Sequence, residues 1–347
     1  MTTPEKCYKA LMAGVDQFGG NNDAEPVIKA FHMGAAAHGE ENMRKRFEQS
    51  AKRLLRNIFR IGLFENPYID AKESAEVVGC PAYMKAGYEA QKKSVVLLKN
   101  KEQLLPLQKG IKVYIPDCPA TFLYGMPALF SPDLNVPGHP WIEENLAGKY
   151  MTLVKTPEEA DAAIVFMESP HPMIPGYNQD AGYVPISLQY RPYTAKQGRA
   201  SSLASGDPYC FENPDRTYLG KTNTCANESH LTVFEETVDK MAGKPVIAVI
   251  DLVSPMILAE VEPKAAAILV GFELQKQAYL DMVFGNDEPS GLLPFQMPAD
   301  METVENSRED VPFDCVPYTD EEGHVYDFAY GMNYKGIITD DRTKRYR

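Results

Sequence analysis

The side chains that could do chemistry gather in one long segment of this sequence, residues 168–228. Its carboxylates include Glu168 and Asp180, and its arginines include Arg191. Six tyrosines lie among them: Tyr177, Tyr183, Tyr190, Tyr193, Tyr209 and Tyr218. Tyrosine offers an apolar face and a polar tip, and carboxylates and arginines hydrogen-bond to hydroxyl groups, so this composition is typical of a sugar-binding site. Alternatively, the tyrosines attach a long loop to the protein surface.

Sequence signatures of other chemistries are absent. No G-x-G-x-x-G follows an apolar run, and there is no Walker loop and no G-x-S-x-G elbow. The six histidines contain no H-x-x-x-H pair, and the six cysteines are far apart with no C-x-x-C pair. We therefore expect neither a cofactor nor a metal site.

Charge and hydropathy exclude two classes of partner. The formal net charge of −13 argues against a nucleic-acid surface, which needs a basic patch. No apolar run approaches the roughly 20 residues that span a bilayer. The first ten residues lack the charged and then apolar pattern of a signal peptide, so the chain as written is expected to be cytoplasmic.

Apolar runs that alternate with amphipathic stretches predict the architecture of residues 82–340. Continuous apolar strands between helices indicate a mainly parallel sheet with helices on both faces, which is a layered α/β sandwich. Ligands of such sheets bind beyond the carboxyl ends of the strands, here at the loops that begin at Glu168, Asp251 and Gly271. The expected strands are 94–99, 111–115, 162–167, 245–250 and 265–272, and the expected helices are 82–93, 231–242 and 274–284. A short helix capped by Thr156, with Glu159 completing a capping box, and another near 256–262 are also expected.

The N-terminal part has a different pattern. Apolar residues at helical spacing predict a helix over 40–61, and two prolines indicate an extended linker over 63–81. Residues 13–18 suggest a short buried strand whose neighbours are not in this sequence. The predicted division is therefore 1–62, a linker at 63–81 and a domain at 82–340.

Several segments, in order, resemble the family 3 glycoside hydrolases, the group of β-glucosidases and β-xylosidases. They are "AGVDQFGG", "RLLRNIFRIGLFENPYID", "SVVLLKNKEQLLPLQ", "ADAAIVFMESP", "GKPVIAVI", "AAAILVGF", "PSGLLPFQMP" and "YDFAYGMNY". The resemblance implies a catalytic barrel followed by a layered α/β domain, with the active site between them. It also implies a retaining mechanism, in which two carboxyl groups lie about 5–5.5 Å apart. A complete barrel takes about 250 residues, so residues 1–62 are interpreted as the C-terminal remnant of a TIM-type barrel.

The resemblance also suggests site residues. The family nucleophile is an Asp in a Ser/Thr-Asp-Trp motif before "AGVDQF", and the single tryptophan here, Trp141, lies in a different context, "HPWIEE". The opening of the acid/base loop matches Glu168, Ser169 and Pro170, but the position of the family's glutamate falls on Met173. This leaves Asp180 and Glu168 as the catalytic candidates. The substrate-binding candidates are Asp16, Tyr177, Tyr183 and Arg191.

The sequence therefore predicts a glycoside hydrolase of the β-glucosidase/β-xylosidase type that acts on a carbohydrate substrate and is incomplete in this chain. The alternative is a remnant without catalysis that binds sugar or a partner protein through 168–228. Because a barrel remnant would expose apolar surface, association or homo-oligomerisation through residues 1–62 is expected.

Overall fold

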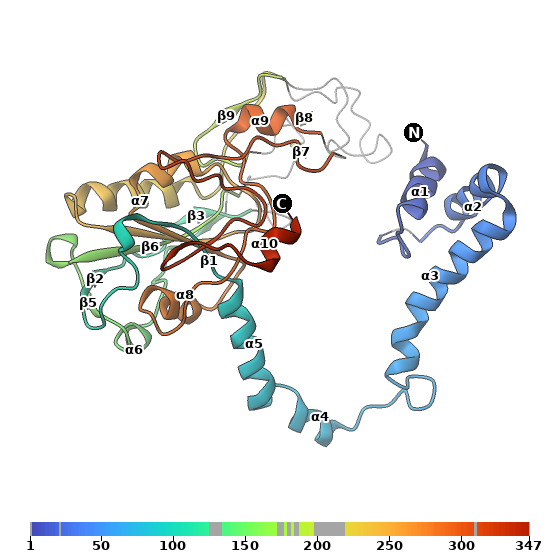
Figure 1. Cartoon of the computed structure of the whole chain (residues 1–347), viewed down its shortest axis with the longest axis horizontal. Coiled ribbons are helices and arrows are strands. Elements are labelled where there is room, and N and C mark those ends of the chain that lie inside the picture. Colours follow the sequence, from blue (N-terminus) through green and yellow to red (C-terminus); the bar gives the residue numbers. More distant parts are fainter. Residues whose placement is uncertain are drawn as a thin grey trace. The chain divides into compact units, whose positions relative to one another are not determined.

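The computed structural model describes residues 2–20, 22–124, 134–171, 177–178, 182–183, 187–197, 219–308 and 311–346. These residues form two compact units, 1–81 and 82–347 (Figure 1). No helix in the described part of the chain is long and apolar enough to cross a membrane.

The first unit consists of helices in its described residues. They are α1 (Thr3–Met12), α2 (Glu25–His38), α3 (Glu40–Arg60) and α4 (Ala71–Val77). Cys7, Leu11 and Ala30 form its small buried core. The prediction of a helix over 40–61 is confirmed by α3, although Leu54 and Leu55 on its apolar face are exposed.

Two predictions for this unit are wrong. Residues 13–18 form no strand, because the described chain places no second strand beside them and a strand needs a hydrogen-bonding partner. The linker at 63–81 is not extended throughout, because the Asp70 side chain accepts the backbone N–H of Glu73 at 2.8 Å and caps α4. The part that precedes the α/β unit is therefore helical in its described residues.

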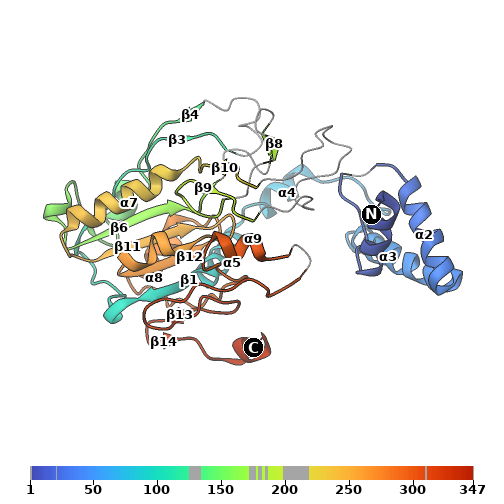
Figure 2. The ribbon, with the colours of Figure 1, turned by 90° about the horizontal axis from the view of Figure 1, so that it is seen from above.

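The second unit is built on one eight-stranded sheet, in the order β14-β13-β1-β12-β11-β6-β2-β5. The run from β12 to β5 is parallel, and β1, β13 and β14 add antiparallel pairs at the other side. Figure 2 shows the run from β6 to β14 side by side. The prediction of a mainly parallel sheet is confirmed. The strands are β1 (Val96–Asn100), β2 (Lys112–Tyr114), β5 (Thr152–Val154), β6 (Ala162–Glu168), β11 (Val246–Asp251), β12 (Ala267–Gly271), β13 (Met332–Asn333) and β14 (Gly336–Ile337).

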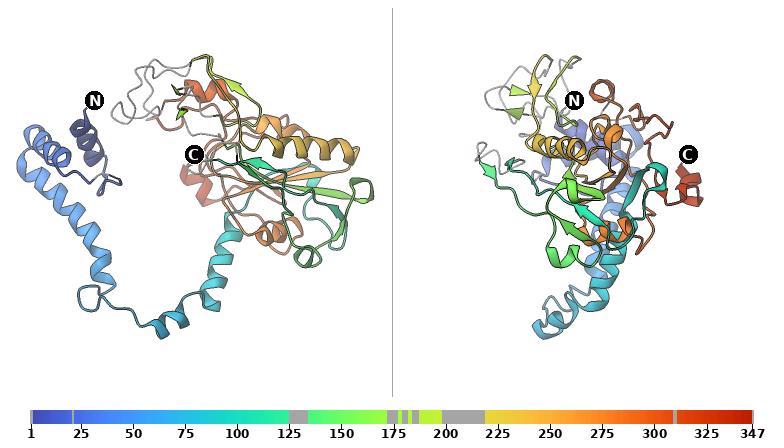
Figure 3. Two further views of the ribbon diagram at one scale, coloured as in Figure 1. Left: turned by 180° about the vertical axis from the view of Figure 1, so that it is seen from behind. Right: turned by 90° about the vertical axis from the view of Figure 1, so that its left-hand side faces the viewer.

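Helices cover both faces of this sheet, as predicted. Helix α7 (Glu228–Met241) lies along one face and α8 (Lys276–Val283) lies on the other (Figure 3). The remaining helices are α5 (Pro81–Ser94), α6 (Glu144–Ala147), α9 (Met301–Asn306) and α10 (Asp341–Tyr346). Antiparallel pairs of two-residue strands join β3 (Thr121–Phe122) to β4 (Asn135–Val136), β7 (Tyr177–Asn178) to β8 (Gly182–Tyr183), and β9 (Tyr193–Thr194) to β10 (Thr222–Asn223).

The two short helices expected near 156 and 256–262 are only three-residue 3₁₀ turns. Near 156 there is one such turn, Pro157–Glu159, and near 256–262 there are two, Leu258–Glu260 and Glu262–Lys264; another covers Lys101–Gln103. Thr156 makes no capping hydrogen bond, so the predicted capping box does not form. Ala160 is extended and leads directly into β6, which leaves no length for a full helical turn.

The central strands explain why the sheet forms here. Every residue of β11 and β12 is buried, and so are the first six residues of β6. Fully burying one such aliphatic side chain contributes about 1.5–3 kcal/mol. The apolar runs of β6 and β11 thus place the first polar residue after each run, Glu168 and Asp251, at the carboxyl edge of the sheet.

Candidate functional site

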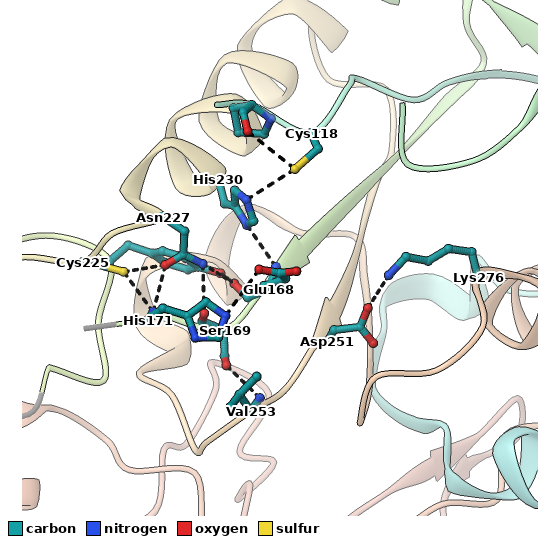
Figure 4. A network of polar contacts seen from close by, with 12 residues as sticks. Cys118, Glu168, Ser169, His171, Cys225, Asn227, His230, Asp251, Val253 and Lys276 are labelled. Carbon is teal, nitrogen blue, oxygen red and sulfur yellow. Dashed lines mark hydrogen bonds and ion pairs between the residues drawn. The ribbon is translucent and has the colours of Figure 1, made fainter. Parts of the chain in front are cut away.

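The carboxyl ends of β6, β11 and β12 meet at one edge of the sheet. Glu168 is paired with Asp251, and Asp251 is paired with Gly271, in the parallel register of these strands. This edge is where the sequence places the ligand-binding loops. Figure 4 shows the polar network around Glu168 and Asp251.

The Glu168 carboxylate is the most accessible acidic group of this network. Its side chain is 34% exposed, and its Oε2 lies 3.3 Å from Nε2 of His171. The close contact with the His171 ring lowers the pKa of Glu168, although burial opposes the shift. The His171 ring is buried and stacks on Tyr124, with centroids 3.9 Å apart. Glu168 is therefore a carboxylate at neutral pH, held against a fixed imidazole.

The backbone around Glu168 is held by the start of α7. Asn227, which precedes this helix, donates from Nδ2 to the carbonyl oxygen of Ser169 at 3.0 Å. Its Oδ1 accepts the backbone N–H of His171 at 2.9 Å. The Tyr190 hydroxyl donates to the carbonyl oxygen of Glu168. These contacts leave the turn after β6 little freedom, so the position of the carboxylate is set by the fold.

His230 supports the same strand end from α7. Its Nδ1 accepts the backbone N–H of Glu168 at 3.1 Å, so the neutral ring carries its proton on Nε2. Burial lowers the pKa of His230 to about 4. Its Nε2 lies 3.8 Å from the sulfur of Cys118, whose pKa burial raises to about 11. At neutral pH the pair is an uncharged imidazole beside a thiol, which suits a structural support and not a nucleophile.

Asp251 has a different environment from Glu168. Lys276 forms an ion pair with its Oδ2, and the Tyr279 hydroxyl donates to its Oδ1. The backbone N–H of Leu274 approaches the same Oδ1 at 3.4 Å. Asp251 is buried, with 7% of the residue exposed. Its carboxylate is engaged within the protein, so it orders the loop after β12.

Of the site residues proposed from the sequence, the structure describes the side chains of Glu168, Arg191 and Asp16. Asp180 lies outside the described residues. Tyr177 and Tyr183 face each other in the backbone register of β7 and β8, and their side chains lie outside the described part of the structure. The guanidinium of Arg191 pairs with Glu228 at 2.7 Å and also with Glu235.

Asp16 lies in the first unit, where α3 holds its carboxylate. Ser50 donates to Oδ1 at 2.7 Å, Arg46 does so at 3.0 Å, and Arg53 reaches Oδ2 at 3.1 Å. This environment is that of a residue that joins the end of α1 to α3.

The residues of the network that are not predicted from the sequence include His171, Asn227, His230 and Lys276. The spacing of histidines in a sequence indicates metal ligands, and it does not reveal histidines that support a carboxylate. The described residues contain no group of three or more His, Cys, Asp or Glu side chains that could hold a metal ion. The one signal available is the position of His171, three residues after Glu168 in the turn that follows a buried strand.

Comparison with known proteins identifies the α/β unit. The model of the glycosyl hydrolase family 3 C-terminal domain matches residues 95–334. A probable beta-glucosidase C of Aspergillus flavus is 29% identical over 347 residues, which cover 99% of this chain and 43% of that protein. A periplasmic beta-glucosidase/beta-xylosidase of Dickeya chrysanthemi is 26% identical over 96% of this chain and 40% of that protein.

The beta-glucosidase from Listeria innocua is 16% identical, with a TM-score of 0.49, over 96% of this chain and 44% of that chain. The present chain thus spans less than half of each of these relatives. The match to the family model covers more than half of the whole chain, and so the chain belongs to glycosyl hydrolase family 3, with the C-terminal domain of that family at residues 95–334.

Proposed function

We propose that this chain is part of a retaining glycosidase of the β-glucosidase/β-xylosidase type and that the carboxyl edge around Glu168 faces the sugar. The observation that carries the proposal is an ionised, partly exposed carboxylate at the end of a buried strand, fixed by His171 and Asn227. Relatives named as a β-glucosidase and a β-glucosidase/β-xylosidase support the substrate class.

The lowered pKa of Glu168 supports different roles for the two candidate carboxylates, Glu168 and Asp180. A proton donor must be protonated when the leaving group departs. The lowered pKa of Glu168 suits a group that accepts hydrogen bonds from sugar hydroxyls and stabilises positive charge in the transition state. We therefore assign proton transfer to Asp180 and substrate positioning to Glu168. The nucleophile of the retaining mechanism is assigned to no residue of this chain.

The test is turnover of an aryl β-glucoside and an aryl β-xyloside by the purified chain. Asp180→Asn is expected to lower kcat by about 10²–10⁴-fold, because proton transfer in the transition state contributes that range. Glu168→Gln is expected to raise KM. Turnover that is unchanged in both variants would overturn the assignments.

A second function is favoured by the share of the relatives that the chain spans, 43% of the Aspergillus flavus protein and 40% of the Dickeya chrysanthemi protein. It is sugar or partner binding without catalysis. An increase in melting temperature with glucose or xylose, together with no turnover of either aryl glycoside, would favour this function over hydrolysis.

A further inference from the structure

Lys276 occupies an unusual place for a lysine. It is the first residue of α8, where the positive end of the helix dipole disfavours a cation. The first turn of α8 contains no acidic residue that would offset this charge. Its side chain is only 20% exposed. A residue that departs from a local preference in this way, next to a proposed site, is expected to have a role there.

The contacts of Lys276 show what the charge does. Asp251 anchors the ammonium from β11. The same nitrogen lies 5.0 Å from the centre of the Trp141 ring and 5.5 Å from that of Phe166. A cation at this distance from an aromatic face is attracted to it, most strongly when the ring is an indole and the contact is partly desolvated.

Trp141 depends on such side-chain contacts for its position. It belongs to no helix or strand in the described chain. Its ring lies 6.1 Å from Phe166 on β6 and makes an edge contact at 5.7 Å with His230, the residue that accepts the backbone N–H of Glu168. The indole also borders a cavity of about 690 Å³ together with Ile115, Asp117 and Ile142. Trp141 is thus half-buried next to the carboxyl edge, with open space on one side.

We propose that Lys276 is a positioning residue of the sugar site, whose ammonium, anchored by Asp251, holds the indole of Trp141 as an aromatic wall beside Glu168. The proposal rests on the proposed function in that it takes this edge to be the sugar site. The contact between Lys276 and Trp141 can be measured without turnover.

The single tryptophan of the chain makes the measurement specific. Fluorescence excited at a wavelength that tyrosine does not absorb reports Trp141 alone. Removing a nearby charge shifts the emission even if the ring does not move, so accessibility to acrylamide is the deciding measurement. Lys276→Met is expected to raise the quenching constant, and Lys276→Arg to restore it, because a guanidinium also stacks on aromatic faces.

Lys99→Met is the matched control. Lys99 is 13% exposed and pairs with the buried Glu262 at 2.5 Å, on β1 opposite Ile268 in β12. The substitution therefore removes a lysine–carboxylate pair of similar burial near the other end of β12. It is expected to lower stability without changing the quenching of Trp141.

Glucose and xylose then test the link to the site. Either sugar is expected to protect Trp141 from acrylamide in the wild-type chain, and Lys276→Met is expected to raise the apparent Kd by roughly three- to tenfold. If Lys276→Met does not fold, the double variant Lys276→Met/Asp251→Asn removes both charges of the pair and takes its place.

Three results would overturn the proposal. The first is equal quenching in the wild type and Lys276→Met. The second is an increase in Lys99→Met as large as in Lys276→Met, which would indicate general loosening. The third is quenching that neither sugar changes in the wild type. The third result can occur while the aryl glycosides are turned over, so failure of this inference is distinct from failure of the proposed function.

Discussion

Two carboxylates lie side by side at the ends of β6 and β11, but their hydrogen-bond partners and their exposure to solvent differ. Glu168 and Asp251 are paired in the same register, and each comes after a run of buried residues. Asp251 is bound by Lys276 and Tyr279 from α8, whereas the Glu168 side chain is 34% exposed and contacts His171. A carboxylate whose charge is already compensated by groups of the protein stabilises the fold, whereas an accessible carboxylate can bind a ligand.

The two strand ends differ because different segments supply their contacts. Lys276 and Tyr279 are three residues apart on α8, so both face the same side of the helix and converge on Asp251. No helix comes directly after β6 in the described residues. The support of Glu168 comes instead from Asn227 and His230, about sixty residues later, and acts mainly on the backbone.

The largest effect is expected at Asp251. Asp251→Ala leaves Lys276 without its counter-ion and Tyr279 without its acceptor, and breaking a buried pair in this way costs about 3–5 kcal/mol. Chemical denaturation followed by circular dichroism measures this loss. Asp251→Asn, which retains an acceptor for Tyr279, is the control and should lose less. A loss below about 1 kcal/mol in Asp251→Ala would show that the pair is not needed for the fold.

The unfolding free energy should depend on pH through His230, which accepts the backbone N–H of Glu168. Burial lowers the pKa of His230 from 6.5 to about 4, so the unfolded chain takes up a proton at this residue below pH 6.5, whereas the folded chain does so only near pH 4. Stability is therefore lost as the pH falls through this window, by about 2–3 kcal/mol between pH 6.5 and 4.5. The titratable groups that act on the His230 ring or lie beside it are Glu168, His171, His139 and Cys118.

His230→Asn tests this assignment, because the amide oxygen takes the place of Nδ1 and does not titrate. The fall in unfolding free energy between pH 6.5 and 4.5 should be smaller in this variant, and His32→Gln, on α2 in the first unit, should behave as the wild type. An equal pH dependence in the wild type and His230→Asn would assign the loss to other groups.

The sequence predicts the sheet well where burial alone decides. The runs at 162–167, 245–250 and 265–272 are confirmed by β6, β11 and β12, because a strand covered on both faces must be apolar throughout. The direction of a strand within the sheet is harder to predict from the sequence than its position in the chain. The antiparallel orientation of β1 depends on pairing with β12 and with β13, more than 160 residues away.

The candidate site is predictable only in part. Glu168 is found because it ends an apolar run, but its backbone is supported by Asn227 and His230, whose distances in sequence give no spacing signal. At residues 13–18 the sequence instead predicts an element that does not form. A short apolar pattern there suggests a strand, yet the described chain provides no partner for one.

Ser169 joins the end of β6 to the loop after β11. Its hydroxyl accepts the backbone N–H of Val253 in that loop at 3.0 Å, and the residue is fully buried. Ser169→Ala leaves this N–H unpaired and should cost about 1–2 kcal/mol. Denaturation measures the loss, and Ser229→Ala, whose exposed hydroxyl donates to Ala120 at 2.9 Å, is the control. A loss in Ser169→Ala no larger than in Ser229→Ala would mean that the two strand ends are not coupled through this bond.

The smallest effect on stability is expected at Glu168, and it decides whether the two carboxylates truly differ in role. Glu168→Gln removes the charge of one partly exposed carboxylate that contacts the His171 ring, which should cost less than about 1 kcal/mol of unfolding free energy. The same variant should weaken protection of Trp141 by glucose, because the accessible carboxylate is the proposed acceptor for sugar hydroxyls. Asp251→Asn provides the matched carboxamide at the neighbouring strand end. If Glu168→Gln destabilises the chain as much as Asp251→Ala does and leaves glucose binding unchanged, then both carboxylates serve the fold and the site has to be sought elsewhere along this edge.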